Sequence, residues 1–357
     1  MKKYIAALCA VAMLAGCSSS TATSTTASTA AASTAATTAA ASTGSLKVGI
    51  GSTTSFSTVD ADGEDDGSIQ VATTYASVVL DGDTIKYVYF DVAQNKGTFS
   101  STGAITSDAS AATPTKKEKG ADYGMAKASS IGKEWYEQID ALEKWAVGKT
   151  VSDFENMAVT TNDEGSNVPD DADLKTGCTM GVDAFITAFK AAVENATEVD
   201  GTIAQVGTGS KTSMKLSDAD GEDDGSVQSN VTYAVVALDA DGKVLFTQDD
   251  VAQDSAKFTS AGVLDGDATE AKTKMAKGAD YGMSKVSQVG EWFEQNEGFE
   301  AWTVGKTSAD ISGMATTTND EGSTVTDDAD LKTTTTINIT DLQGAVVTAI
   351  ANAAALN

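Results

Sequence analysis

Runs of β-branched and aromatic residues predict two strand pairs. Residues 69–80 and 84–91 are such runs, and Asp81-Gly82-Asp83 separates them. Residues 227–238 and 243–248 show the same arrangement around a turn at 239–242. Aspartate and glycine between two such runs are typical of β-hairpins. We therefore expect an antiparallel hairpin early in each half of the chain.

Helical spacing of apolar residues follows each hairpin. Seven apolar residues recur every three or four positions in the first half: Met125, Ala128, Ile131, Trp135, Ile139, Leu142 and Trp145. This spacing predicts one helix with an apolar face. Residues 152–155 fit a capping box that opens a short second helix. Apolar positions from Val182 to Val193 predict a third helix that begins just after Thr179. The predicted fold class is α+β, with a small antiparallel sheet packed with helices in each domain.

The whole pattern occurs twice. Residues 60–67 return as 218–225 and residues 120–125 as 278–283, at an offset of 158, whereas landmarks from Trp145 onward return at 157. So long a period indicates duplicated domains and not the short units of a solenoid. We expect two tandem homologous domains, at residues 46–198 and 199–357.

The N-terminus has a different pattern. Lys2-Lys3, an apolar run over residues 4–15 and Leu14-Ala-Gly-Cys17 together resemble a bacterial lipoprotein signal with its lipobox. Such a signal, residues 1–16, is removed before Cys17, which becomes lipidated; an ordinary secretory signal cut elsewhere is the alternative. Residues 17–45, almost entirely Ser, Thr and Ala after the cysteine, are a predicted flexible tether. The expected location is the outer face of the cell membrane, lipid-anchored as in Gram-positive bacteria.

Composition narrows the chemistry. The 357 residues include three cysteines and no histidine, which excludes the usual Cys/His zinc centres, Cys-x-x-Cys-His haem attachment and four-cysteine iron–sulfur clusters. Catalytic triads with histidine are excluded too, and no catalytic residue is predicted. The net charge of −27 would repel nucleic acid. Any cofactor is organic, or a metal held by oxygen.

One loop carries a chemical signature. The stretch Asp173-Leu-Lys-Thr176-Gly177-Cys178-Thr179 returns near the C-terminus as Asp330-Leu-Lys-Thr333-Thr-Thr-Thr336. The first copy resembles the Asp-x-x-Ser/Thr-Gly-Ala-Ser/Thr signature of FMN-binding domains that carry the flavin covalently. The resemblance implies FMN on Thr179 and Thr336, attached by an FAD:protein FMN transferase, although Thr334 and Thr335 replace the glycine and the small residue. A threonine before a helix also suits a phosphate, or serves as a simple N-cap.

Other motifs leave alternatives open. Residues 120–125 and 278–283 place Tyr123, Met125, Tyr281 and Met283 where they either contact a flavin or shape a helix start. The tryptophans at 135, 145, 292 and 302 are expected in the core, with stacking on a flavin as the alternative. The acidic stretch 60–67 suggests calcium, but an EF-hand loop needs glycine and glutamate where Asp65 and Val71 stand. We expect no metal there.

Over its mature length the chain resembles the flavinylated surface lipoproteins of Gram-positive extracellular electron transfer. The resemblance implies an electron carrier, not an enzyme, with one covalent FMN per domain. It implies a membrane quinol-linked dehydrogenase as donor and external acceptors such as ferric iron or soluble flavins. The alternative is a surface binding module or adhesin with two acidic, calcium-holding domains. A solute-binding lipoprotein fits less well, because such proteins close two unlike lobes around one cleft.

Overall fold

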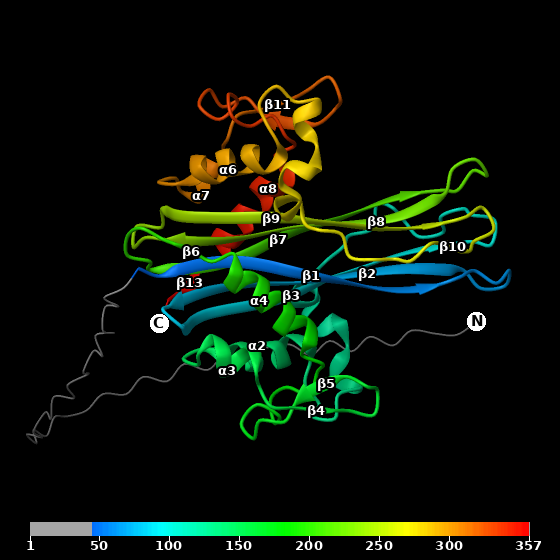
Figure 1. Ribbon diagram of the computed structural model, residues 1–357, viewed down its shortest axis with the longest axis horizontal. Coiled ribbons are helices and arrows are strands. Elements are labelled where there is room, and N and C mark those ends of the chain that lie inside the picture. Colours follow the sequence, from blue (N-terminus) through cyan, green and yellow to red (C-terminus); the bar gives the residue numbers. More distant parts are fainter. Residues whose placement is uncertain (1–44, 357) are drawn as a thin grey trace, which may run out of the picture. The chain divides into compact units, whose positions relative to one another are not determined.

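Helices and antiparallel sheets make up the described part of the chain, which confirms the predicted α+β class (Figure 1). The computed structural model describes residues 45–356, which lie in one compact unit. The predicted signal peptide and Cys17 lie outside the described residues, and so does nearly all of the predicted tether. No helix within 45–356 is long and apolar enough to cross a membrane.

Two large antiparallel sheets occupy the centre. The first has the strand order β3-β2-β1-β6, formed by β1 (Lys47–Val59), β2 (Gly67–Asp81), β3 (Thr84–Phe99) and β6 (Thr197–Glu198). The second has the order β10-β9-β8-β7-β13, formed by β7 (Gln205–Ser217), β8 (Gly225–Leu238), β9 (Val244–Phe258), β10 (Leu264–Asp265) and β13 (Ala354–Ala355). Both predicted hairpins, β2–β3 and β8–β9, are confirmed.

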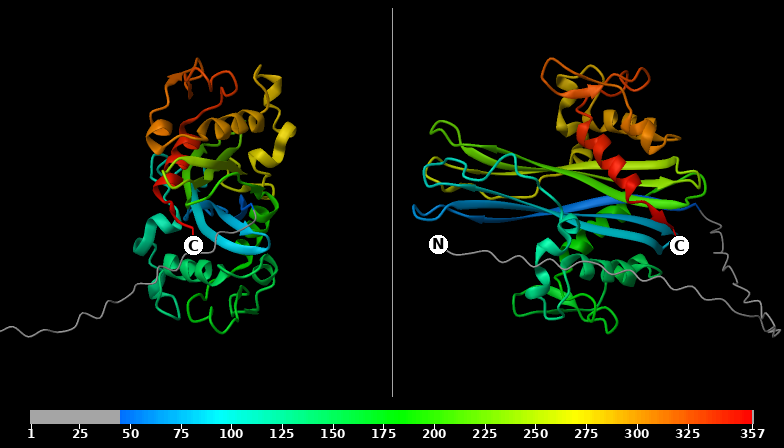
Figure 2. Two further views of the ribbon diagram at one scale, coloured as in Figure 1. Left: turned by 90° about the vertical axis from the view of Figure 1, so that its left-hand side faces the viewer. Right: turned by 180° about the vertical axis from the view of Figure 1, so that it is seen from behind.

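Helices cover the outer face of each sheet (Figure 2). In the first half these are α1 (Lys116–Lys119), α2 (Trp135–Ala146), α3 (Val151–Glu155) and α4 (Asp183–Glu194), with 3₁₀ turns η1 (Gly120–Tyr123) and η2 (Met125–Lys127). The second half has α5 (Lys274–Lys277), η3 (Gly278–Tyr281), η4 (Met283–Lys285), α6 (Trp292–Thr303), α7 (Ser308–Ser312) and α8 (Thr340–Ala351). Small hairpins complete each half: β4 (Val159–Thr161) with β5 (Asn167–Pro169), and β11 (Thr316–Thr318) with β12 (Thr324–Thr326).

Two helix predictions were wrong in detail. The single helix expected over residues 125–145 is a 3₁₀ turn followed by a loop, and α2 begins at Trp135. Gly132 has φ +63°, a left-handed conformation that interrupts a helix. The capping box before α3 is Thr150 with Asp153, two residues earlier than expected, and each side chain bonds the other's backbone N–H.

The two sheets share a core. The rings of Tyr75 and Tyr233 stack at 5.4 Å, and those of Phe99 and Phe258 stack at 4.0 Å. The Tyr75 hydroxyl also donates to Ser210 Oγ at 2.9 Å across the interface. The halves therefore pack as one body, with the boundary near residue 198 still a prediction from the sequence.

Candidate cofactor site

Thr179 is held by a glutamine of helix α2. Both its backbone N–H and its hydroxyl donate to Gln138 Oε1, at 2.9 Å and 3.2 Å. Thr336 makes the same two bonds to Gln295 Oε1, at 2.8 Å and 3.0 Å. The two loops predicted to carry the flavin thus attach to the helical layer through the same side-chain bonds.

Helix α4 begins later than expected. Its first residue is Asp183 and its N-cap is Val182, so the prediction of a helix starting directly after Thr179 was wrong. The Val182 N–H donates to the Asn167 carbonyl at 2.9 Å, which ties residues 179–182 to β5 before the helix can start. Thr179 is therefore not an N-cap, and its hydroxyl does not lie at the end of the helix dipole.

Gln138 links several predicted residues. Its Nε2 donates to Ser129 Oγ at 3.0 Å and approaches Met125 Sδ at 3.6 Å. Glu134 Oε2 accepts from the Met125 N–H at 2.8 Å. The turn at Met125 is thereby joined to Thr179 through one buried side chain. Sequence reasoning missed Gln138; the available signal was a polar residue on an apolar helix face, repeated as Gln295.

A cavity of about 900 Å³ opens beside this network. Thr179, Met125 and Trp135 all line it, together with Phe185 of α4 and Lys116 of α1. Most of the other lining residues are polar, and they include the carboxylates of Asp163 and Glu164. Small-ligand cavities measure about 300–1,000 Å³. The structure therefore brings two of the predicted residues, Thr179 and Met125, to one cavity that can hold a molecule the size of a nucleotide.

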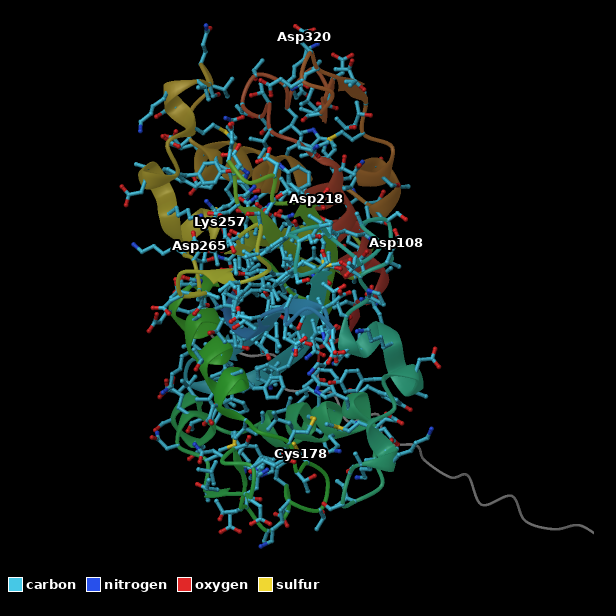
Figure 3. All side chains as sticks on the ribbon, turned by 90° about the vertical axis from the view of Figure 1, so that its right-hand side faces the viewer. Asp108, Cys178, Asp218, Lys257, Asp265 and Asp320 are labelled. Carbon is cyan, nitrogen blue, oxygen red and sulfur yellow. The ribbon has the colours of Figure 1, made fainter. Side chains whose placement is uncertain are left out.

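Other predicted residues of the first loop lie outside the cavity lining. Asp173 and Thr176 are exposed, and the Thr176 hydroxyl donates to the Asp173 carbonyl at 3.3 Å. Gly177 and Cys178 are buried, and burial raises the pKa of the Cys178 thiol to about 11. Figure 3 labels Cys178 in the first half of the chain. Tyr123 packs against the first-half core.

Lys116 faces aromatic rings at the cavity wall. Its Nζ lies 5.0 Å from the centre of the Tyr123 ring and 5.5 Å from that of Trp135. A cation over an aromatic face is stabilised by about 0.5–1 kcal/mol at exposed sites. Lys116 makes no ion pair within residues 45–356. This lysine, also missed from the sequence, is a positive charge that a ligand in the cavity can use.

The second half has a much smaller cavity. It measures about 150 Å³ and is lined by Lys274, Trp292 and Asp341 among others, but not by Thr336, Tyr281 or Met283. Thr336 is exposed. Asp330 and Thr333 are exposed too, and the Thr333 hydroxyl donates to the Asp330 carbonyl at 3.2 Å. The second predicted loop is therefore built like the first, but Thr336 does not line the smaller cavity of its half.

The acidic stretches form turns whose carboxylates bind the backbone. Asp62 Oδ1 accepts from the N–H groups of Glu64 and Asp65, at 3.1 Å and 2.9 Å. Asp60 Oδ1 reaches the other half and accepts from the Leu264 N–H at 2.8 Å. Within residues 45–356, no group of three or more His, Cys, Asp or Glu side chains is arranged to hold a metal ion.

No protein family model, curated protein or solved structure matches the chain. The case for a flavin therefore depends on the loop signature and on the cavity beside Thr179. Both belong to the first half.

Proposed function

We propose that this chain carries FMN covalently on Thr179 and serves as an electron carrier on the outer face of the cell membrane. The supporting observation is that Thr179, the last residue of the flavin-type signature, lies in the wall of a 900 Å³ cavity with Trp135 and Met125. An ordinary N-cap threonine would be expected at a helix start, and Thr179 is not there.

The cavity residues fit such a group. Trp135, Met125 and Phe185 offer apolar contact to a planar ring, and Lys116 offers a positive charge. Gln138 positions Thr179 by accepting from both its N–H and its hydroxyl. Attachment requires Thr179 Oγ1 to lose its proton to the transferase and to form a P–O bond as AMP leaves FAD. The hydrogen bond from the Thr179 hydroxyl to Gln138 Oε1 must therefore break when the FMN ester forms.

Bound FMN supplies the electron transfer, and the protein supplies attachment, orientation and electrostatics. Because the chain is expected outside the membrane, an ester on Thr179 prevents a small cofactor from diffusing away. The partners of the proposal are the FAD:protein FMN transferase, a membrane quinol-linked donor and external acceptors such as ferric iron or soluble flavins. Thr336 is the proposed second acceptor, on the loop that repeats the first.

Intact-mass measurement after co-expression with the transferase tests the attachment. Each FMN adds roughly 440 Da, set by flavin phosphate less the water lost on attachment. Thr179→Ala should remove one adduct, and Thr336→Ala should remove any second one. Thr187→Ala is the matched control, because its exposed hydroxyl lies on helix α4, outside both the signature and the cavity wall. Absence of any adduct on protein from its native host would contradict the proposal and favour a surface binding module.

A further inference from the structure

The small cavity of the second half occupies the same place in its half as the large cavity of the first. Each residue that lines the 150 Å³ cavity has a sequence counterpart in the lining of the 900 Å³ cavity. Val251 corresponds to Val92 at an offset of 159, because the turn at 239–242 is one residue longer than the turn at 81–83, and the other residues follow the offsets of 158 and 157. Lys274 and Trp292 correspond to Lys116 and Trp135, at the offsets of the two repeats. The two cavities are therefore versions of one site, and the difference in volume needs a local cause.

Three larger polar side chains supply that cause. Asn230 stands where the first half has Ala72, Asn338 where it has Gly181, and Asp341 where it has Ala184. The three second-half residues all carry side-chain atoms beyond Cβ, and their three first-half counterparts do not. The Asn338 side chain is also fixed in place, because its Oδ1 accepts from the Thr340 N–H at 3.0 Å.

The two cavities also differ in the charged side chains that lie near their lysines. Lys274 Nζ lies 5.5 Å from the Tyr281 ring centre and 5.3 Å from that of Trp292, close to the distances of Lys116 from its own two rings. Burial, followed by Lys277, lowers the pKa of Lys274 from its ordinary value, and the nearby Asp250 and Asp341 only partly oppose this shift. Lys274 shares the second cavity with the Asp341 carboxylate, whereas Ala184 stands at that position of the first cavity, whose carboxylates are Asp163 and Glu164.

We propose that the two halves differ in ligand capacity. The first-half cavity seats one planar, anionic aromatic ligand with Lys116 as its cationic partner, and Asn230, Asn338 and Asp341 close the second-half cavity to such a ligand. The inference rests on the proposed function, because the ligand class is that of the flavin on Thr179. A cavity of 150 Å³ is below the range of about 300–1,000 Å³ that small-ligand sites occupy. A flavin attached to Thr336 would therefore remain in solvent.

Flavin fluorescence and visible circular dichroism per adduct test the inference on the full chain co-expressed with the transferase. In Thr336→Ala protein the flavin on Thr179 should show several-fold quenched fluorescence and a strong induced dichroic signal, because its ring packs against Trp135. In Thr179→Ala protein any remaining flavin should fluoresce like free FMN. Equal quenching at the two positions would overturn the proposal.

Reciprocal variants then change one cavity into the other. Gly181→Asn with Ala184→Asp should release the quenched flavin of the first half, whereas Thr187→Asp on the exposed face of the same helix should not. Asn230→Ala with Asn338→Gly and Asp341→Ala, in the Thr179→Ala background, should quench a flavin on Thr336.

Lys116→Ala should weaken the induced dichroic signal of the flavin on Thr179, and Lys119→Ala should not. An unchanged signal in the closing double variant would overturn the proposal.

A titration with free FMN separates this inference from the proposed function. If no variant carries an adduct, covalent attachment fails, and the unloaded chain is titrated with FMN instead. One site of binding that Gly181→Asn with Ala184→Asp abolishes would still support the cavity assignment. No binding to the parent chain would overturn it.

Discussion

Thr334 lies directly against Gly298 of helix α6. A β-carbon placed on Gly298 would stand 3.0 Å from Thr334 Oγ1 and 3.1 Å from Thr334 Cβ. The first half has the opposite arrangement, with Gly177 in the loop and Ala141 on the helix, and a β-carbon on Gly177 would lie 2.8 Å from Ala141 Cβ. The second loop thus has threonine where the flavin signature has glycine, and the facing helix has glycine in place of alanine, which makes room for the larger loop residue.

This exchange predicts a coupled pair of substitutions. Gly298→Ala alone should destabilise the protein by about 1–3 kcal/mol through overpacking, despite alanine's better helix propensity. Thr334→Gly in the same chain should recover most of that loss, because it restores the first-half arrangement. Urea denaturation of the single and double variants gives the coupling energy. A coupling energy near zero would mean that the two residues do not constrain each other.

Strands β1 and β7 could not be predicted from the alternation of apolar residues. Their sequences contain Gly49, Gly51, Gly207 and Gly209, and glycine is depleted in strands. The structure explains the glycines, because helices α4 and α8 pack directly on these strands. Glycine in a strand marks close approach of another backbone, which depends on tertiary packing. The hairpins were predictable because their turns and apolar runs are local.

Gly51→Ala should therefore be strongly destabilising. A β-carbon at residue 51 would overlap the backbone of Ala191 and Ala192 in α4, and no flexible side chain can move aside. We expect a loss of about 3 kcal/mol or more, at the upper end of overpacking costs. Ser57→Ala, at an exposed position of the same strand, is the control. Thermal denaturation followed by circular dichroism measures both, and an unchanged melting temperature for Gly51→Ala would contradict the packing.

A buried glutamate has a cation in the first half but not in the second. Glu143 Oε1 accepts from the Phe90 N–H and from Lys117 Nζ, both at 2.7 Å. Glu300 Oε1 accepts from the Asp249 N–H at 2.8 Å, but Met275 stands where the first half has Lys117. Asp249 is fully buried, and neither of its carboxylate oxygens has a hydrogen-bond partner. Within residues 45–356, the buried Asp249 and the half-buried Glu300 therefore lie side by side and neither makes an ion pair.

This pair predicts a pH-dependent stability. Burial raises the pKa of Asp249 from 3.8 to about 8, and burial with Asp249 beside it raises that of Glu300. The folded chain binds the protons of these two carboxyls more tightly than the unfolded chain does. The contribution of the protonated carboxyls to the free energy of unfolding is therefore full below about pH 4 and is lost as the pH rises toward 8. Asp249→Asn should thus stabilise the protein at pH 8.5 relative to the parent, by on the order of a few kcal/mol.

Urea denaturation at pH 5 and pH 8.5 measures the effect. The gain from Asp249→Asn should shrink at pH 5, where the parent carboxyl is protonated. Asp241→Asn, at an exposed turn, should show no such dependence. An equal effect of Asp249→Asn at both pH values would show that the carboxyl does not titrate in this range.

The candidate site was partly predictable. The loop signature indicated Thr179, and the clustering of Tyr and Met in a repeated motif indicated Met125, since both signals are local in sequence. Gln138 and Lys116 could not be found in that way, because each reaches the cavity from a different helix. The closure of the second cavity by Asp341 depends on which helix face meets the sheet, and this is known only after folding.

Chelation should leave the protein's thermal stability nearly unchanged. Asp62 and its counterpart Asp220 accept backbone N–H groups within their own turns, and these bonds lower the pKa of both carboxyls. A turn satisfied in this way needs no ion to form. Melting curves with and without a calcium chelator measure the difference. A shift of more than about 5 °C, on the order of 1 kcal/mol or more, would support a calcium-stabilised turn.

Cys17→Ala should abolish membrane anchoring. The sequence before it, Leu14-Ala-Gly, places this cysteine at the cleavage point of a lipoprotein signal, so its thiol is the predicted site of the lipid. Without the lipid, the chain should appear in the medium or remain as a precursor, because a short apolar run does not span a bilayer. Fractionation with an antibody against the folded part measures this. Cys9→Ala is the matched control, since Cys9 leaves with the signal. If Cys17→Ala protein still fractionates with the membrane like the parent, the lipobox interpretation is wrong and another segment must hold the protein there.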